Sequence, residues 1–168
     1  MSSNTASVAE IPRCATDGRF YCNHQEDYPT EIVSRIMKYY RYPLKSMFKQ
    51  RKKQVMSTLA EDNTSGLVCE SQTRLLRIGW AMNTDGRWLV VLNTDQYQQY
   101  ITEVVCRTTR DSCNYVPPCY KAKCLQRFNT QKLLVIDPVV PHRGPFLSEF
   151  LFPSCCVCHI PSSTAKLT

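Results

Sequence analysis

The feature that most constrains this chain is the concentration of cysteine toward its C-terminal end. Ten cysteines occur among 168 residues, and seven of them lie between Cys106 and Cys158. This density is about twice what an ordinary cytosolic enzyme carries, and it predicts a disulfide framework. Because disulfides persist only where no thiol pool reduces them, the pattern predicts a secreted, extracellular protein. A zinc-binding use of the same thiols would instead place the protein inside the cell.

The tail of the chain contains three cysteines within four residues, Cys155, Cys156 and Cys158. On a strand, successive side chains point to alternate faces. We therefore expect Cys156 and Cys158 to lie on one face and Cys155 on the other. Two disulfides can then leave the strand together from the same face.

Those two bonds would close a ring if their partners were Cys106 and Cys113, with the connecting backbone completing it. A third bond, from Cys69 to Cys124, could pass through the ring and form a cystine knot. Spacing leaves the pairing open, because six cysteines allow fifteen connectivities and this chain has more. The ring is a hypothesis at this stage.

The hydrophobic pattern of the second half has a period of two, which indicates strands. The clearest is the apolar run from Trp88 to Leu92, which follows the turn-forming pair Asp85 and Gly86. Residues 137–145 contain three prolines and one glycine and suit the tip of a long hairpin. Other segments rich in apolar or β-branched residues are 100–106, 132–136 and 146–152.

The N-terminal part contains one helical pattern. Thr30 follows a proline and suits a helix start, and Ile32, Ile36 and Tyr40 recur at helical spacing. We expect a short amphipathic helix that reaches about residue 40. Pro43 is then expected to stop or kink that helix. Residues 1–13 have the composition of a disordered leader, and we assign them no structure.

The net charge of +7 is concentrated in one segment. Eight lysines and arginines and no acidic residue lie between Arg35 and Lys53, whereas Gln54–Thr168 contains 11 basic and 9 acidic residues. Residues 45–53 are therefore interpreted as an exposed basic linker. The excess of positive charge belongs to that linker rather than to the cysteine-rich part.

The cysteine-rich part resembles the Spätzle (Spaetzle) family, the neurotrophin-like cystine-knot ligands of insects. The resemblance covers roughly residues 67–160. It rests on Trp88 with the apolar run to Asn93, on the Tyr97 region, and on an ordered set of cysteines that ends in Pro153-Ser154-Cys155-Cys156-Val157-Cys158. It implies an all-β, disulfide-rich cystine-knot fold with elongated antiparallel hairpins. A mostly irregular N-terminal segment with one short helix would precede this fold.

The resemblance also implies roles for individual cysteines. Cys155, which strand alternation turns away from the ring, would join two protomers in a homodimer. An intramolecular bond from Cys155 to Cys119 is the alternative, because Cys119 has no partner in the family pattern. Cys14 and Cys22 can close a small local loop. The implied intrachain bonds are Cys69 with Cys124, Cys106 with Cys156, and Cys113 with Cys158.

The family is activated by proteolysis, which implies a processing site in the basic run. The candidates are Arg51, Lys52 and Lys53, recognised by a basic-specific protease. The expected domains are 1–53, a pro-region or linker, and 54–168, the cystine-knot domain. No signal peptide is readable at the start of this sequence. Asn63 begins the sequon Asn63-Thr64-Ser65 and is a glycosylation candidate.

The function implied by the resemblance is signalling through a Toll-type leucine-rich-repeat receptor. Because extended strands have little interior, we expect one chain to be unable to bury all of its large apolar side chains, which favours dimerisation. The side chains in question are Trp88, Leu92, Phe150 and Phe152.

The competing function classes are weaker. An intracellular zinc module would use Cys113, Cys119, Cys124 and the cluster from Cys156 to His159, but these spacings differ from the usual pairs two to four residues apart. An enzyme is not expected, because His24, His142 and His159 lie in no catalytic motif and no phosphate loop is present. We expect no cofactor, no metal, no membrane insertion and no nucleic-acid partner. The tyrosines near the basic run, at 39, 40 and 42, are better explained as part of the helix.

Overall fold

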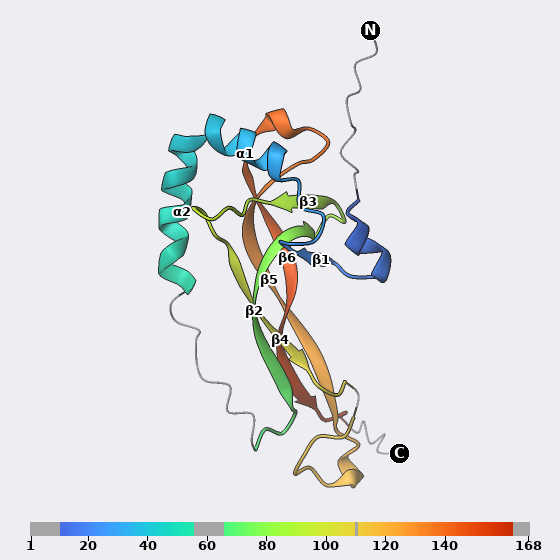
Figure 1. The fold of residues 1–168 in the computed structure, drawn as a ribbon. Coiled ribbons are helices and arrows are strands. Elements are labelled where there is room, and N and C mark those ends of the chain that lie inside the picture. Colours follow the sequence, from blue (N-terminus) through green and yellow to red (C-terminus); the bar gives the residue numbers. More distant parts are fainter. Residues whose placement is uncertain (1–10, 56–65, 110, 163–168) are drawn as a thin grey trace. The chain divides into compact units, whose positions relative to one another are not determined.

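The computed structural model of this chain describes residues 11–55, 66–109 and 111–162 (Figure 1). Its strands form a six-stranded sheet in the order β1-β2-β3-β5-β6, with β4 paired to β2. The pairings β1–β2, β2–β3 and β3–β5 are antiparallel. The strands are β1 (Tyr21–Asn23), β2 (Ser71–Met82), β3 (Trp88–Val91), β4 (Tyr100–Cys106), β5 (Lys123–Ile136) and β6 (Phe146–His159).

The chain divides into two compact units. Unit 1 consists of the described parts of Met1–Leu59, Leu76–Ile101 and Thr130–Leu151. Unit 2 consists of the described parts of Ala60–Leu75, Thr102–Asn129 and Phe152–Thr168. Strands β2, β4, β5 and β6 contribute residues to both units. The helices are α1 (Thr30–Tyr39) and α2 (Arg41–Val55), and three short 3-10 helices are η1 (Arg13–Asp17), η2 (Pro118–Tyr120) and η3 (Pro141–Arg143).

The predicted all-β, disulfide-rich architecture is confirmed. The strand at Trp88 follows a tight turn, in which Asn83 donates from its backbone N–H to Arg87 O at 2.9 Å and Gly86 has a φ of 78°. Glycine reaches this left-handed region without a side-chain clash. Residues 137–145 connect β5 to β6, as predicted. Both of those strands are longer than the apolar segments that indicated them.

Two strands were missed by the pattern. In β2, the first half has exposed or half-buried side chains, and Gly79 lies in its second half. Glycine is depleted in strands, so the segment has a weak strand signal. Its conformation is determined by pairing, because Trp80 lies opposite Val90 of β3 and Cys22 of β1. Strand β1 is only three residues long and has no periodicity to detect.

The predicted helix is α1, but the predicted basic linker is wrong. Residues 45–53 lie in a second helix, α2, which extends from Arg41 to Val55. Pro43 is the third residue of that helix. A proline in the first turn loses no intrahelical hydrogen bond, so it begins α2 rather than ending helical structure. Lys, Arg and Gln are also good helix formers, which explains the continuation.

The described part of the N-terminal segment is not mostly irregular, because it contains η1, β1, α1 and α2, and it contributes side chains to the core of unit 1. Val33 and Ile36 from α1 and Leu44 and Phe48 from α2 are buried. They belong to one apolar cluster with Trp80, Trp88, Val90, Leu92, Leu134 and Ile136. The segment thus packs against residues of the hairpin strands.

This packing corrects the expectation that a single chain leaves large apolar side chains uncovered. Trp88 is 9% exposed, and Leu92, Phe150 and Phe152 are at most 1% exposed. The sequence did not reveal that α1 and α2 would cover the first two. Dimerisation is therefore not needed to bury these four residues. Among the described residues, no helix is both long enough and apolar enough to cross a bilayer.

Candidate functional site: the cystine knot and its exposed thiols

Unit 2 contains three disulfides that join the cysteines implied by the family resemblance. Their Cα–Cα separations are 5.7, 5.1 and 5.8 Å, within the usual range for disulfides. The first bond connects the segment before β2 to the start of β5, and the other two connect β4 and the following loop to β6. The bonds are Cys69–Cys124, Cys106–Cys156 and Cys113–Cys158.

The sulfurs of this cluster are packed together. Cys113 Sγ lies 3.8 Å from Cys69 Sγ and 4.0 Å from Cys124 Sγ. These three residues and Ala122 are buried, and Cys156 packs against them from β6. Two bonds therefore close a ring through β6, and the third bond lies in contact with the ring. The cluster replaces an apolar core in this unit.

Backbone hydrogen bonds hold the loop between Cys106 and Cys124 against the residues on either side of Cys69, just before β2. Arg107 N–H donates to Glu70 O at 2.9 Å, and Asn114 N–H donates to Val68 O at 2.7 Å. Cys124 N–H donates to Asp111 O at 2.9 Å. These contacts position both sulfurs of the third bond next to the ring.

Gln126 of β5 is a positioning residue that the sequence did not reveal. Its Oε1 accepts a hydrogen bond from Cys106 N–H at 2.8 Å. Its Nε2 donates to Val104 O at 2.8 Å and to Cys155 O at 3.1 Å. One amide therefore ties the end of β4 and the second half of β6 to β5. A single glutamine in a strand has no pattern that distinguishes it from an ordinary surface residue.

Cys155 is an exposed free thiol at the edge of this cluster. Its neighbour Cys156 is half-buried and bonded to Cys106, so the two residues differ in the way expected for adjacent positions of a strand. Ser154 Oγ donates to Arg127 O at 3.3 Å and holds the backbone just before the thiol. The Cys155 thiol is thus presented to solvent from a fixed strand.

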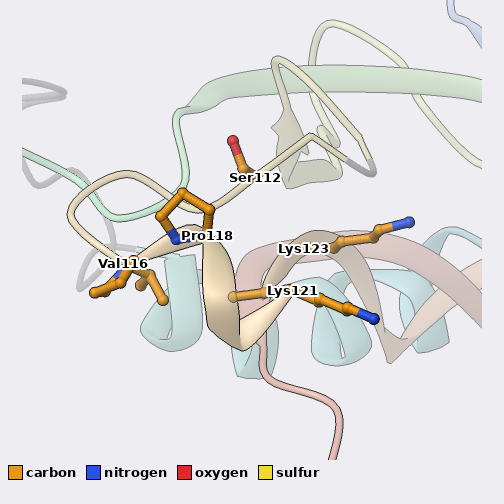
Figure 2. A pocket seen from close by; sticks show the side chains of 7 residues that line it. Ser112, Val116, Pro118, Lys121 and Lys123 are labelled. Atoms are coloured by element: carbon orange, nitrogen blue, oxygen red, sulfur yellow. The ribbon is translucent and has the colours of Figure 1, made fainter.

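Cys119, the other exposed thiol, lies in the loop that connects Cys113 to Cys124. It is not bonded to Cys155, so the intramolecular alternative is absent from the structure. The loop contains η2 and has Tyr115 and Lys121 at φ values of 63° and 49°. It surrounds an open, mostly apolar pocket of about 300 Å³ (Figure 2), lined by Ser112, Val116, Pro117, Pro118, Lys121, Ala122 and Lys123.

Unit 1 has a disulfide between Cys14 and Cys22, with Cα atoms 6.0 Å apart. Both residues are buried in the core of the unit. Trp80 Nε1 donates to Asp27 O at 2.9 Å, so the segment after Cys22 is also tied to β2. The Cys14–Cys22 disulfide thus stabilises the N-terminal segment, whose strand β1 pairs with β2.

A polar contact beside this bond involves His24 and Tyr28, whose ring centroids are 4.1 Å apart. Tyr28 Oη donates to Val91 O at 2.8 Å and accepts from Asn93 N–H at 2.9 Å. Burial raises the pKa of the Tyr28 hydroxyl well above its usual range. The His24 Nε2 lies 3.0 Å from Asn93 O, and burial lowers the pKa of its imidazole.

The cysteines proposed for the zinc alternative are mostly in disulfides. Of the five cysteines in that alternative, Cys119 is free, and the bonded ones are Cys113, Cys124, Cys156 and Cys158. Cys113 and Cys124 also have their sulfurs within 4.8 Å of the bonded Cys69. A bonded sulfur cannot serve as a thiolate ligand. His142 and His159 are exposed, His159 directly follows the bonded Cys158, and His24 belongs to unit 1.

Two predicted modification sites have little structural description. Asn63 lies outside the described residues. Arg51, Lys52 and Lys53 lie in the last turns of α2, and only their backbone is described. The carbonyl groups of a last helical turn have no intrahelical partner, so that turn opens at lower cost than the middle of the helix.

Comparisons with known proteins give the same assignment. The family model described as Spaetzle matches residues 66–160, more than half of the chain. The protein spaetzle 3 of Drosophila melanogaster is 36% identical over 91 residues, which are 54% of this chain and 14% of that protein. Neurotrophin 1 of the same organism is 31% identical over 100 residues, which are 60% and 11% of the two chains.

Protein spaetzle of the same organism is 24% identical over 158 residues, covering 86% of this chain and 46% of that protein. A crystal structure of a spatzle cystine knot has 22% sequence identity and a TM-score of 0.33, covering 58% of this chain and 96% of the other. The chain spans less than half the length of these curated relatives. Its cystine knot and the match over residues 66–160 show that it belongs to the Spaetzle family.

Proposed function

We propose that this chain is a secreted signalling ligand that acts as a disulfide-linked dimer and binds a Toll-type leucine-rich-repeat receptor after proteolytic processing. The observation that carries the proposal is the exposed thiol of Cys155 beside the bonded Cys156. In an oxidising compartment, an exposed thiol on a rigid strand is available for a bond to a second copy. The proposed activity is binding, without catalysis.

The dimer would have two-fold symmetry, because the same residue of each protomer makes the bond. Two identical surfaces can engage two receptors, and the effective concentration of the second site strengthens the second contact. The loop at residues 137–145 is a reasonable place for a receptor contact, since connecting loops often bind partners. Family membership supports the receptor class.

Processing is proposed at Arg51, Lys52 or Lys53, which would divide the chain near residue 53. The last turn of α2 would unwind so that its backbone could enter the active site of a protease. Because Cys14 is bonded to Cys22, no disulfide among the described residues joins the part before the cut to the part after it. The cut would therefore leave only non-covalent contacts between the helices and the core of unit 1. Asn63 is proposed as a glycosylation site just after this boundary.

The test is to express the full chain in a secretory host and compare reducing with non-reducing gels. The wild type is expected in the medium as a dimer that reduction converts to monomer. Cys155→Ser should remove the dimer, whereas the matched control Cys119→Ser should retain it. A monomer under both conditions, or a dimer in Cys155→Ser, would overturn the proposed linkage.

Receptor binding is tested separately with the processed dimer and immobilised leucine-rich-repeat ectodomains of Toll type. The dimer should dissociate more slowly than the Cys155→Ser monomer, because it has two sites. A substitution of Arg51, Lys52 and Lys53 by Gln should prevent cleavage by a basic-specific protease. Absence of binding to every such ectodomain would refute the receptor class, and bound zinc with free thiols would favour the intracellular module.

A further inference from the structure

The first observation is a group of exposed cations on the outer side of the helices. Arg35 and Lys38 of α1 and Arg41 and Lys45 of α2 are all exposed. Arg41 and Lys45 are four residues apart on one helix and so share a face. In the described part of the chain, four ion pairs involve cations outside this group. These pairs are Arg19–Glu26, Arg77–Asp95, Arg87–Asp137 and Lys132–Glu149.

The second observation is that tertiary structure adds a distant basic segment to this group. Tyr40 Oη, between the two helices, donates to His142 O at 3.4 Å. A Cβ at Gly144 would lie 2.6 Å from Tyr40 Cζ, so the two segments are in close contact. Figure 1 shows the short helix η3 beside α1. The exposed side chains of His142 and Arg143 therefore lie next to the basic helices.

The third observation is that aromatic rings accompany the charges. Tyr39 is 82% exposed and Tyr42 is 88% exposed, values unusual for residues of this size. Tyr39 packs edge-on against Tyr40, with ring centroids 4.9 Å apart. These rings and hydroxyl groups offer apolar contact and hydrogen bonds beside the cations. We name the set Arg35, Lys38, Tyr39, Arg41, Tyr42, Lys45 and Arg143 the basic face.

We propose that the basic face binds a linear sulfated polysaccharide. Helix α2 is about 22 Å long, so an extended anionic chain can contact several turns at once. Its sequence continues with Lys49, Lys52 and Lys53, which lengthens the run of positive charge. Such a run attracts a polyanion by releasing its condensed counterions.

Two observations favour this partner over other anions. The apolar side of α2 is already used, because Leu44 and Phe48 are buried in unit 1, so the helix has no free apolar face to insert into a membrane. The choice of a polysaccharide over a nucleic acid rests on the proposed function, which places the chain outside the cell. If processing removes the helices, this face would bind the polysaccharide only in the unprocessed chain.

The experiment measures retention of the full, uncleaved chain on immobilised heparin, with a sulfopropyl resin as the comparison for net charge. The wild type should elute from heparin at a higher salt concentration than from the sulfopropyl resin. The variant R35Q/K38Q/R41Q/K45Q should bind heparin at least about tenfold more weakly, and its salt slope should fall by about four.

The matched control is R74Q/K121Q/K123Q/R127Q, which removes four exposed cations from unit 2 and changes the net charge equally. It should shift heparin elution much less. Arg143→Gln alone should weaken binding, because the fold brings that residue to the helices. Circular dichroism and non-reducing gels on each variant establish that folding and disulfides are retained.

Equal shifts in the two quadruple variants would overturn the proposal, because net charge alone would then explain retention. Stronger salt-resistant binding to single-stranded DNA, or to vesicles with anionic lipid, would also overturn it in favour of those partners. Cys155 has no part in this surface, so Cys155→Ser should bind heparin through each protomer. The absence of a dimer would therefore refute the Cys155 linkage alone, and the absence of specific heparin binding would refute the role of the basic face alone.

Discussion

The side-chain oxygen of Gln126 accepts a hydrogen bond from the backbone N–H of Cys106 at 2.8 Å, beside the disulfide that joins Cys106 to Cys156. The nitrogen of the same amide donates to Cys155 O, directly before that disulfide. The proposed dimer cysteine and the first ring cysteine are thus positioned by one side chain. The positions of these two cysteines therefore depend on a neutral amide side chain that no pattern in the sequence distinguishes.

Replacing Gln126 by Ala should destabilise the protein by about 2 kcal/mol, because the Cys106 N–H loses its partner in a part-buried site. Gln126→Glu keeps an oxygen acceptor and loses the donor to Val104 O and Cys155 O. It therefore separates the contribution of the amide oxygen from that of the amide nitrogen. Non-reducing urea unfolding measures the effect. The exposed Gln98→Ala is the control, and equal stability of all three variants would contradict the positioning role.

Gly79 lies where the N-terminal segment crosses β2, and a Cβ there would approach His24 Cα and Tyr28 Cδ2 at 3.0 Å. One of these neighbours is backbone, so Gly79→Ala should destabilise unit 1 by about 1–3 kcal/mol. Tryptophan fluorescence during unfolding reports the loss through Trp80. Gln72→Ala, an exposed change in the same strand, should leave the midpoint unchanged, and an unaltered midpoint in Gly79→Ala would show that the segment containing His24 and Tyr28 adapts.

His24 should make the stability of unit 1 depend on pH. Its pKa in the folded protein is below the ordinary 6.5, chiefly because of burial. The hydrogen bond to Asn93 O opposes this lowering, Arg77 adds to it, and Asp95 opposes it. The unfolded state therefore binds the proton more readily. The stabilisation from the neutral ring is complete above pH 6.5 and declines as the pH falls through the folded-state pKa.

The measurement is the urea midpoint at about pH 7.5 and about pH 5, where the His24 contribution differs most. His24→Asn should lose less stability on acidification than the wild type. His142→Asn, which changes an exposed histidine, should behave as the wild type does. The same acid sensitivity in all three proteins would assign it to carboxyl groups instead.

The disulfides should differ in their contribution according to loop length. On the chain-entropy model, removing Cys69–Cys124 costs about 4 kcal/mol and removing Cys14–Cys22 about 2.5 kcal/mol. Each pair is changed to Ala and unfolding is followed without reductant. The second variant should keep the disulfides of unit 2, as mapped by mass spectrometry, because Cys14 and Cys22 bond to each other. Scrambling of the bonds of unit 2 would contradict this expectation.

The sequence by itself determined the class of this protein. Strand alternation separated Cys155 from Cys156 and Cys158, because a period of two is a local property of the backbone. The apolar run at Trp88 and the pair Asp85-Gly86 predicted a strand and its turn for the same reason. These features depend on neighbours in the chain and can be read without a fold.

Only the tertiary structure decided what covers the apolar residues and what organises the polar ones. Trp88 is buried in one cluster with Leu44 and Phe48, and the role of Gln126 depends on residues of β4 and β6 that are 20 and 29 residues away in sequence. The basic run was interpreted as a linker because Pro43 breaks helices in their interior, yet here it occupies a first turn. Contacts between distant segments, which no local pattern encodes, determined each of these outcomes.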